Sequence, residues 1–200
     1  MATTPRTRPL RADAERNQQR IVLAAQEAFA EQGLEVSMEE IARRAGVGPA
    51  TLYRRFPSKQ ELLGSIIEAR LAELEPLIAE ATAAEDPWEG LLAGIGALLE
   101  SQARNMALVQ VLAQAGEWTA LKPALRERVF APLGATFARA QASGRLRGDL
   151  EASELPALIK MVATTIAHDG NCGQSRNWQR YLALLADALR TPVPTTLPSL

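Results

Sequence analysis

The chain has 200 residues, of which 47% are hydrophobic and 22% are charged, and its formal net charge is −1. This composition excludes a disordered or fibrous protein and is ordinary for a soluble globular chain with a sizeable core. The only cysteine, Cys172, excludes an internal disulfide, and no apolar run approaches the ~18 residues of a membrane span. Residues 1–9 lack a signal-peptide pattern, so we expect a cytoplasmic protein.

The charges are unevenly distributed along the chain. Residues 1–60 hold ten basic and seven acidic side chains, whereas the remainder holds twelve basic and sixteen acidic ones. A basic N-terminal part on an acidic remainder indicates a DNA-binding head with a separate second function.

Residues 1–11 show no periodicity, and we expect them to be disordered. Their arginines Arg6, Arg8 and Arg11 could follow a DNA backbone or enter a minor groove, as basic arms do. A tail that only aids solubility is the alternative, and the sequence leaves both open.

A helix is predicted over residues 12–32, because apolar residues recur at helical spacing and Gly33 follows as a C-terminal stop. We expect this helix to pack on the segment that follows it. The small core predicted there consists of Phe29, Leu34, Ile41, Leu52 and Phe56.

Residues 36–63 contain two short helices and the start of a third. Ser37 with Glu40 forms a capping-box pattern that opens the first helix, and the glycines of residues 46–48 end it. Pro49 suits the first turn of the second helix, which we expect to run to about Phe56. Two helices joined by a glycine-containing turn are typical of a helix-turn-helix.

The second helix turns Leu52 and Phe56 inward, and its outward side is small, hydroxylated or basic. Such side chains can reach phosphates and base edges in a major groove. The alternative is a helical hairpin with a solvated basic face. The outward residues are Ala50, Thr51, Tyr53, Arg54 and Arg55.

This stretch resembles the DNA-binding domain of the tetracycline-repressor (TetR) family over about residues 15–65, roughly a quarter of the chain. The shared features are Phe29-Ala30-Glu31-Gln32-Gly33, Ile41-Ala42, Ala45-Gly46-Val47, Thr51-Leu52-Tyr53, Phe56 and Ser58-Lys59.

The resemblance implies DNA contacts from residues of this stretch. Positions that commonly touch phosphate are matched by Thr51, Tyr53 and Lys59. Positions that read base edges are matched by Pro49, Ala50 and Arg54. Further candidates are the cap residue Ser37 and the basic residues Arg43, Arg44 and Arg55.

A long helix is predicted from Ser58 to about residue 83, with Pro76 expected to kink it or end it nearby. At 1.5 Å per residue it would be about 25–35 Å long and would serve as a lever shared by both parts of the chain.

Caps, prolines and apolar spacing predict further helices over residues 87–102, 106–115, 117–143, 153–169 and 177–190, the third of them interrupted by Pro123 and Pro132. The fold class is therefore all-α with about nine helices. We divide the chain into a basic arm (1–11), a three-helix helix-turn-helix DNA-binding domain (12–57), a helical bundle for ligand binding and dimerisation (58–190) and a tail (191–200).

The last two predicted helices carry wide apolar faces, and the resemblance implies that they pair with their twins in a homodimer. A symmetric dimer would place two recognition helices about 34–36 Å apart, one turn of a palindromic operator. The residues predicted for this interface are Ile159, Val162, Ile166, Trp178, Tyr181 and Leu185.

Several aromatic and methionine side chains of the body could line a cavity for a small apolar or aromatic effector. Plain core packing is the alternative for each of them. They are Trp88, Met106, Trp118, Phe130, Phe137 and Met161.

No catalytic constellation stands out, since His168 is the only histidine, and one histidine with one cysteine is too few for a zinc site. We therefore expect no enzyme activity, metal or cofactor. The sequence predicts a homodimeric transcriptional repressor that a small effector releases from its operator. The alternatives are a regulator without such an effector, and a helical enzyme or adaptor that carries the motif.

Overall fold

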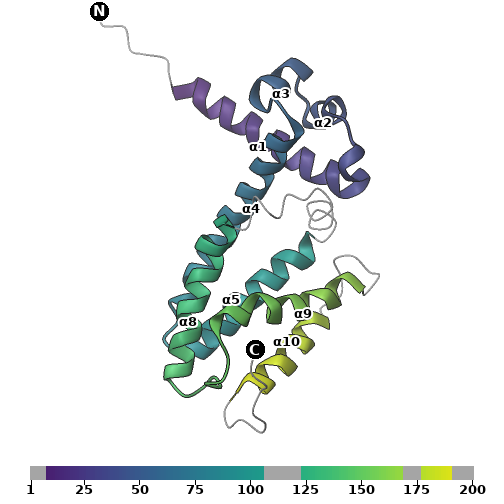
Figure 1. Ribbon diagram of the computed structural model, residues 1–200. Helices are drawn as coiled ribbons and strands as arrows, with labels where there is room; N and C mark the ends of the chain where they lie inside the picture. The colour runs from purple at the N-terminus through teal and green to yellow at the C-terminus, as the bar shows by residue number, and fades with distance from the viewer. Residues whose placement is uncertain (1–7, 106–122, 169–176, 191–200) are drawn as a thin grey trace, which may run out of the picture.

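The computed structural model describes residues 8–105, 123–168 and 177–190 (Figure 1). Within these ranges lie a π-helical segment (Arg126–Phe130), two 3-10 turns (Gly33–Glu35 and Ala152–Glu154) and eight α-helices. The α-helices are α1 (Arg8–Gln32), α2 (Met38–Ala45), α3 (Pro49–Arg55), α4 (Lys59–Thr82), α5 (Pro87–Arg104), α8 (Ala131–Ala142), α9 (Leu155–His168) and α10 (Asn177–Leu189). The predicted all-α fold is confirmed, and the predicted helix over 106–115 lies outside the described residues.

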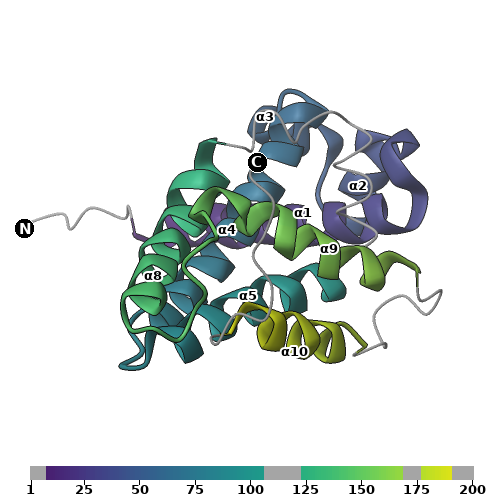
Figure 2. The same ribbon diagram turned by 60° about the horizontal axis from the view of Figure 1, so that its bottom comes forward.

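The helices form two groups joined by α4. Figure 1 shows α1, α2 and α3, which we call the head, gathered around the N-terminal end of α4. The rest of α4 runs beside α8 in the second group, the body, and α9 and α10 lie on the other side of that group in both views (Figures 1 and 2). None of the helices in the described ranges has the length and hydropathy that crossing a bilayer requires.

The head has its own apolar core. Phe29 from α1, Ile41 from α2 and Leu52 from α3 are all completely buried, and Phe56 and the partly buried Leu34 pack against the same cluster. The predicted small core is therefore confirmed. Burial of these side chains removes apolar surface from water, which stabilises the three-helix arrangement.

The long helix α4 belongs to both cores. Leu62 and Ile66 are buried in the head, while Leu71 and Ile78 are buried in the body. The helix continues for six residues beyond Pro76, so this proline does not end it. A rigid element with side chains in both cores can carry a displacement of the body to the head, as predicted for a lever.

Polar contacts reinforce α4 at its centre. On the head side, Arg70 donates a 3.0 Å hydrogen bond to the buried Gln26 of α1. On the body side, Arg128 donates to Glu68 at 2.7 Å and also to Glu75. Arg128 comes from the π-helical segment, so this segment is tied to α4 at two positions about two helical turns apart.

The interruption predicted at Pro132 is confirmed by the π-helical turns that precede α8. Proline has no N–H with which to continue an α-helical ladder, and a wider turn accommodates that loss. The N–H of Ala131 accordingly bonds to the carbonyl of Arg126, five residues earlier.

The N-terminal helix begins earlier than predicted. α1 starts at Arg8, so Arg8 and Arg11 belong to a helix and not to a disordered arm. Pro9 is favourable in a first helical turn, and the leucine, arginine and alanine that follow are strong helix formers. Arg6 lies outside the described residues.

The predicted dimer residues divide between two faces of α9 and α10. Ile159, Val162 and Trp178 are buried in the chain's own core, and Ile166 and Leu185 pack partly against it. This differs from the prediction, because the apolar spacing of these helices marks the side that packs on the body. The exposed apolar side chains of the two helices are Met161, Tyr181 and Leu184.

Candidate DNA interface

The first helix of the motif is fixed by its caps. The Oγ of Ser37 accepts a 3.1 Å hydrogen bond from the N–H of Glu40, as predicted for an N-cap. At the other end Gly46 adopts a φ of 64°, and its N–H bonds back to the carbonyls of Ala42 and Arg43. A left-handed residue at this position is easiest for glycine, so the turn into α3 is specified locally.

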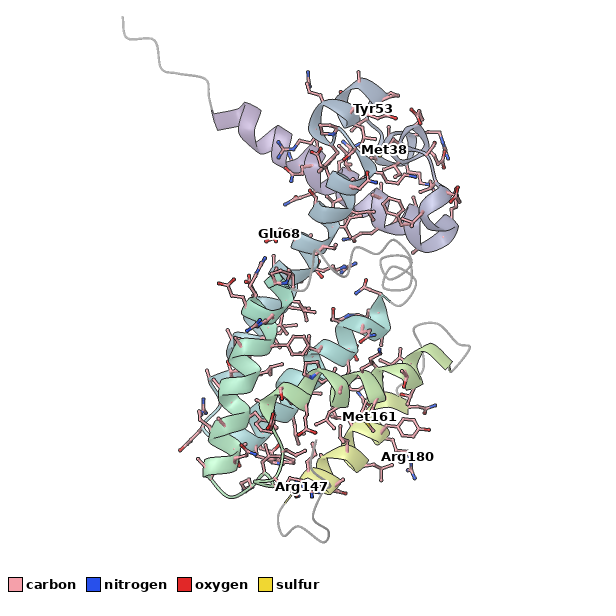
Figure 3. All side chains as sticks on the ribbon, in the orientation of Figure 1. Met38, Tyr53, Glu68, Arg147, Met161 and Arg180 are labelled. Atoms are coloured by element: carbon pink, nitrogen blue, oxygen red, sulfur yellow. The ribbon has the colours of Figure 1, made fainter. Side chains whose placement is uncertain are left out.

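The second helix of the motif buries one side and exposes the other. Leu52 and Phe56 lie in the head core, while Pro49, Ala50, Tyr53, Arg54 and Arg55 are exposed and Thr51 is half-buried. Figure 3 places Tyr53 at the end of the molecule opposite to Met161 and Arg180. The exposed side of α3 is thus a protruding surface with small residues at its start and a phenol and two guanidinium groups behind them.

Contacts from neighbouring helices hold α3 in place. The guanidinium group of Arg20 on α1 donates to the carbonyl of Ala45 at 2.7 Å, which caps the C-terminus of α2. Arg55 donates to the side-chain oxygen of Gln18, also on α1. Sequence reasoning missed Arg20 and Gln18, because no local signal relates residues that lie 25 or more positions apart.

The two arginines of α2 are engaged in ion pairs. Arg43 donates to Glu40 at 2.6 and 2.8 Å, and Arg44 donates to Glu40 at 2.9 Å and to Glu31 at 2.6 Å. Hydrogen bonds from Arg43, and then from Arg44, lower the pKa of Glu40 to about 2. Glu40 therefore pairs with both of these cations and does not complete the reciprocal half of the predicted capping box.

Lys59, in the first turn of α4, also has a partner within the head. Its Nζ lies 2.6 Å from the carbonyl oxygen of Leu34, and the side chain is half-buried. An ammonium group has three donors. One bond to a carbonyl therefore leaves capacity for an anion beside the head.

Tyr53 is paired with an acid that the sequence did not single out. Its hydroxyl donates a 2.9 Å hydrogen bond to Glu39 in the first turn of α2. The pKa of Glu39 is lowered, first by a hydrogen bond from its own backbone N–H and then by Tyr53. The same bond raises the pKa of Tyr53, because the phenol must stay protonated to donate.

The structure therefore brings all ten predicted DNA-contact residues into one part of the molecule. Six of them also have partners inside the head: Ser37, Arg43, Arg44, Tyr53, Arg55 and Lys59. The predicted contact residues that have no such role within the head include Pro49, Ala50 and Arg54, which lie on the exposed side of α3.

The residues predicted for an effector cavity are less closely grouped. Trp88 and Phe137 are completely or almost completely buried in the body core, and Phe130 packs partly against it. Met161 is 63% exposed on α9 and so does not line the interior of a single chain. Met106 and Trp118 lie outside the described residues.

The family described as "Bacterial regulatory proteins, tetR family" matches residues 21–66. An HTH-type transcriptional regulator of Staphylococcus aureus (strain MRSA252) is 43% identical over 82 residues, which are 38% of this chain and 42% of that protein. Another, from strain USA300, is 33% identical over 108 residues, or 52% and 57% of the two chains. The matched part thus spans only about half the length of these curated relatives.

Solved structures extend the similarity to nearly the whole chain. The TetR transcription regulatory protein from Mycobacterium vanbaalenii is 34% identical with a TM-score of 0.65, and the match covers 92% of this chain and 100% of that one. A TetR transcriptional regulator from Streptomyces coelicolor is 28% identical with a TM-score of 0.64, over 88% and 99%. The chain belongs to the TetR family and is a DNA-binding transcriptional regulator.

Proposed function

We propose that this regulator is a homodimeric repressor that binds a palindromic operator through the exposed side of α3. The observation that carries the proposal is the orientation of α3, which buries Leu52 and Phe56, exposes Pro49 and Ala50, and presents Tyr53 at the end of the molecule. Small residues at the start of a recognition helix allow its backbone to approach base edges closely.

The remaining candidate residues fall into two groups. We assign base reading to Arg54, which is exposed on α3, and phosphate contacts to Thr51, Tyr53 and Lys59. Ser37 caps the start of α2. A helix start offers unpaired N–H groups, which favour an anion such as a phosphate oxygen.

Arg43, Arg44 and Arg55 contribute to DNA affinity mainly by charge in this proposal. Each is bonded to a side chain of the head, and breaking that ion pair or hydrogen bond would cost part of what a phosphate contact gains. They raise the local positive potential that attracts DNA, whereas Tyr53 and Arg54 make the directed contacts.

The test of the DNA contact removes an exposed hydroxyl group either from Tyr53 in the head or from Ser153 in the body, each of which donates to a carboxylate. Tyr53→Phe removes only a hydroxyl group and should weaken binding to a selected duplex about three- to tenfold, the size expected for one hydrogen bond. Ser153→Ala, in the body, serves as the control and should leave the affinity unchanged. Equal affinity of both variants and the wild type, measured by fluorescence anisotropy at fixed salt, would contradict the proposed contact.

For dimerisation we infer that the outward side of α9 and α10 is the interface. Met161, Leu184 and Tyr181 are 63%, 57% and 44% exposed on these two helices, and Figure 3 shows Met161 and Arg180 in the same part of the body. Neighbouring exposed apolar side chains on two helices favour burial against a second copy. Of the residues predicted for the interface, Tyr181 lies on this face, whereas the others pack wholly or partly in the body core.

We further infer that the body binds a small apolar or aromatic effector next to Trp88. Within the residues that the structure describes, the buried indole Nε1–H of Trp88 has no acceptor, and the guanidinium group of Arg190 lies 5.4 Å from the ring centroid. An unpaired buried donor is costly, so an acceptor on a bound molecule would be stabilised there. Phe137 and Phe130 belong to the same apolar cluster.

Effector binding would act on DNA affinity through α4. A ligand shifts an equilibrium only by its differential affinity for two states of the protein. The contacts of Arg128 with Glu68 and Glu75 link α4 to the body, and the bond of Arg70 to Gln26 links it to the head. A displaced body helix would thus change the spacing of the two heads in the dimer.

Thermal-shift measurements with a panel of apolar aromatic compounds test the effector. A true effector raises the melting temperature of the wild type by mass action and releases the selected duplex. The Trp88→Phe variant should lose the shift. If no compound of the panel both raises the melting temperature and releases the duplex, the alternative hypothesis is favoured. That hypothesis is a regulator controlled by a protein partner or by its own abundance.

A further inference from the structure

The hydroxyl group of Tyr53 is already occupied in the free protein. It donates to the carboxylate of Glu39 across a 2.9 Å contact that joins α3 to the first turn of α2. Tyr53 is 42% exposed and Glu39 is exposed as well, so the contact lies on the outer surface of the head. A phenol has a single proton to donate.

We propose that Glu39 sets the DNA affinity of this regulator by competing with a DNA phosphate for the hydroxyl proton of Tyr53. The inference rests on the proposed function, in which Tyr53 contacts phosphate. A phosphodiester carries no proton at neutral pH, so it can only accept a hydrogen bond. Tyr53 can therefore donate to it only after breaking its hydrogen bond to Glu39. In the free protein the Glu39 carboxylate thus accepts the hydrogen bond that a phosphate oxygen would accept in the DNA complex.

Electrostatics add to this competition. The hydrogen-bond partners assigned to the Glu39 carboxylate are its own backbone N–H and the hydroxyl groups of Tyr53 and Ser37, all of them neutral. The neighbouring acid Glu40 is instead neutralised by two arginines. Glu39 consequently keeps its charge next to the position at which a phosphate would bind, where like charges repel.

The pKa of Glu39 supports the same conclusion, because it is lowered from 4.5 by its backbone and Tyr53 hydrogen bonds. The side chain is thus a carboxylate at neutral pH. Glu39→Gln keeps the shape, removes the charge and weakens the acceptor for Tyr53, so it separates competition from simple loss of structure.

The test is a double-mutant cycle on the duplex that the wild-type protein enriches from a random library. Glu39→Gln should tighten binding about three- to tenfold, the net size of one ordinary hydrogen bond. In the Tyr53→Phe background the gain should shrink to the part that comes from the charge of Glu39 alone, and Glu35→Gln, which removes the charge of another exposed acid in the head, is the reference for charge removal. That control effect measures long-range electrostatics alone.

A second measurement follows Tyr53 without DNA. Tyr181→Phe leaves Tyr53 as the only tyrosine, and its ionisation can be followed by ultraviolet absorbance. The bond to Glu39 raises the pKa of this phenol above 10.0, so adding Glu39→Gln should lower the pKa toward that value. An unchanged titration curve would mean that the bond does not form in solution, and the inference would be overturned.

The outcomes separate the inference from the proposed function. Equal gains from Glu39→Gln in both tyrosine backgrounds, or a loss of affinity, would overturn the role of Glu39 and leave Tyr53 as a phosphate contact. A wild-type protein that enriches no duplex would contradict the proposed function and the inference together.

Discussion

The ammonium group of Lys59 lies 2.6 Å from the carbonyl oxygen of Leu34, and this bond ties the start of α4 to the 3-10 turn that follows α1. A cation in the first turn of a helix opposes the helix dipole. The bond to Leu34 offsets that cost. Because the ammonium group has further donors, we infer a dual role for Lys59 in stability and in DNA binding.

We expect Lys59→Met to lower the free energy of unfolding by about 1 kcal/mol, as a lost hydrogen bond from a partly exposed charged group does. It should also reduce the slope of log affinity against log salt by about one unit. Urea denaturation and a salt titration of duplex binding measure the two effects. The exposed neighbour Gln60, changed to alanine, is the control, and a variant that matches it in both measurements would contradict both roles of Lys59.

Low pH should weaken the ion pairs that Glu40 forms on α2. The pKa of Glu40 is lowered from 4.5 to about 2 by hydrogen bonds from Arg43 and then Arg44. Between these two pH values the unfolded chain binds more protons at this position than the folded chain does. The contribution of Glu40 to stability is therefore complete above pH 4.5 and is lost as the pH falls toward about 2.

The matching experiment compares Glu40→Gln with the wild type by urea denaturation over this pH range. The variant should be less stable at neutral pH, and the difference should vanish as the pH approaches 2. Glu35→Gln controls for the removal of one acid from the head. A stability difference that is independent of pH would show that the ion pairs do not stabilise the helix.

Two glycines of α5 should respond in opposite ways to alanine. A Cβ on Gly90 would lie 2.4 Å from the carbonyl oxygen of Ala81 on α4, whereas a Cβ on Gly96 would meet its nearest atom, in Leu182, at 4.0 Å. We expect Gly90→Ala to destabilise the protein by about 1–3 kcal/mol through overpacking. Gly96→Ala should stabilise it by about 0.5–1 kcal/mol through helix propensity. Equal melting temperatures of the two variants would contradict the close packing of α4 on α5.

A charge on the outward side of α10 should abolish the dimer. Leu184→Glu places a carboxylate on the proposed interface, where burial without a partner would be unfavourable. Leu77→Glu, on the exposed side of α4, is the matched control, since Leu77 is 40% exposed but lies on another helix. Light scattering after gel filtration should give a monomer for the first variant and a dimer for the second. A Leu184→Glu dimer would exclude this face.

Local signals explain why the head could be predicted. The caps at Ser37 and Ser58, the left-handed Gly46 and the proline at the start of α3 act within a few residues, so the sequence alone determines where α2, α3 and α4 begin. The burial of Leu52 and Phe56 follows from helical spacing once those bounds are set.

Tertiary contacts explain what could not be predicted. Glu39 meets Tyr53 across 14 positions, and Arg128 meets Glu68 across 60, and no periodic pattern encodes such pairs. In α9 and α10 apolar residues occur on two sides, so spacing alone could not separate the side that packs on the body from the side left exposed. The earlier start of α1 reflects favourable helix formers that carry no amphipathic signal.

The stoichiometry and selectivity of the DNA complex test the central claim most directly, which is that two heads in one dimer read one palindrome. The measurement is sedimentation velocity of the wild-type protein with the duplex that it enriches from a random library, beside a scrambled duplex of equal length. We predict a complex of two chains on the enriched duplex, whose half-sites lie about one helical turn apart, and weak salt-sensitive binding to the scrambled one. A monomer that binds both duplexes equally, or neither, would contradict the account.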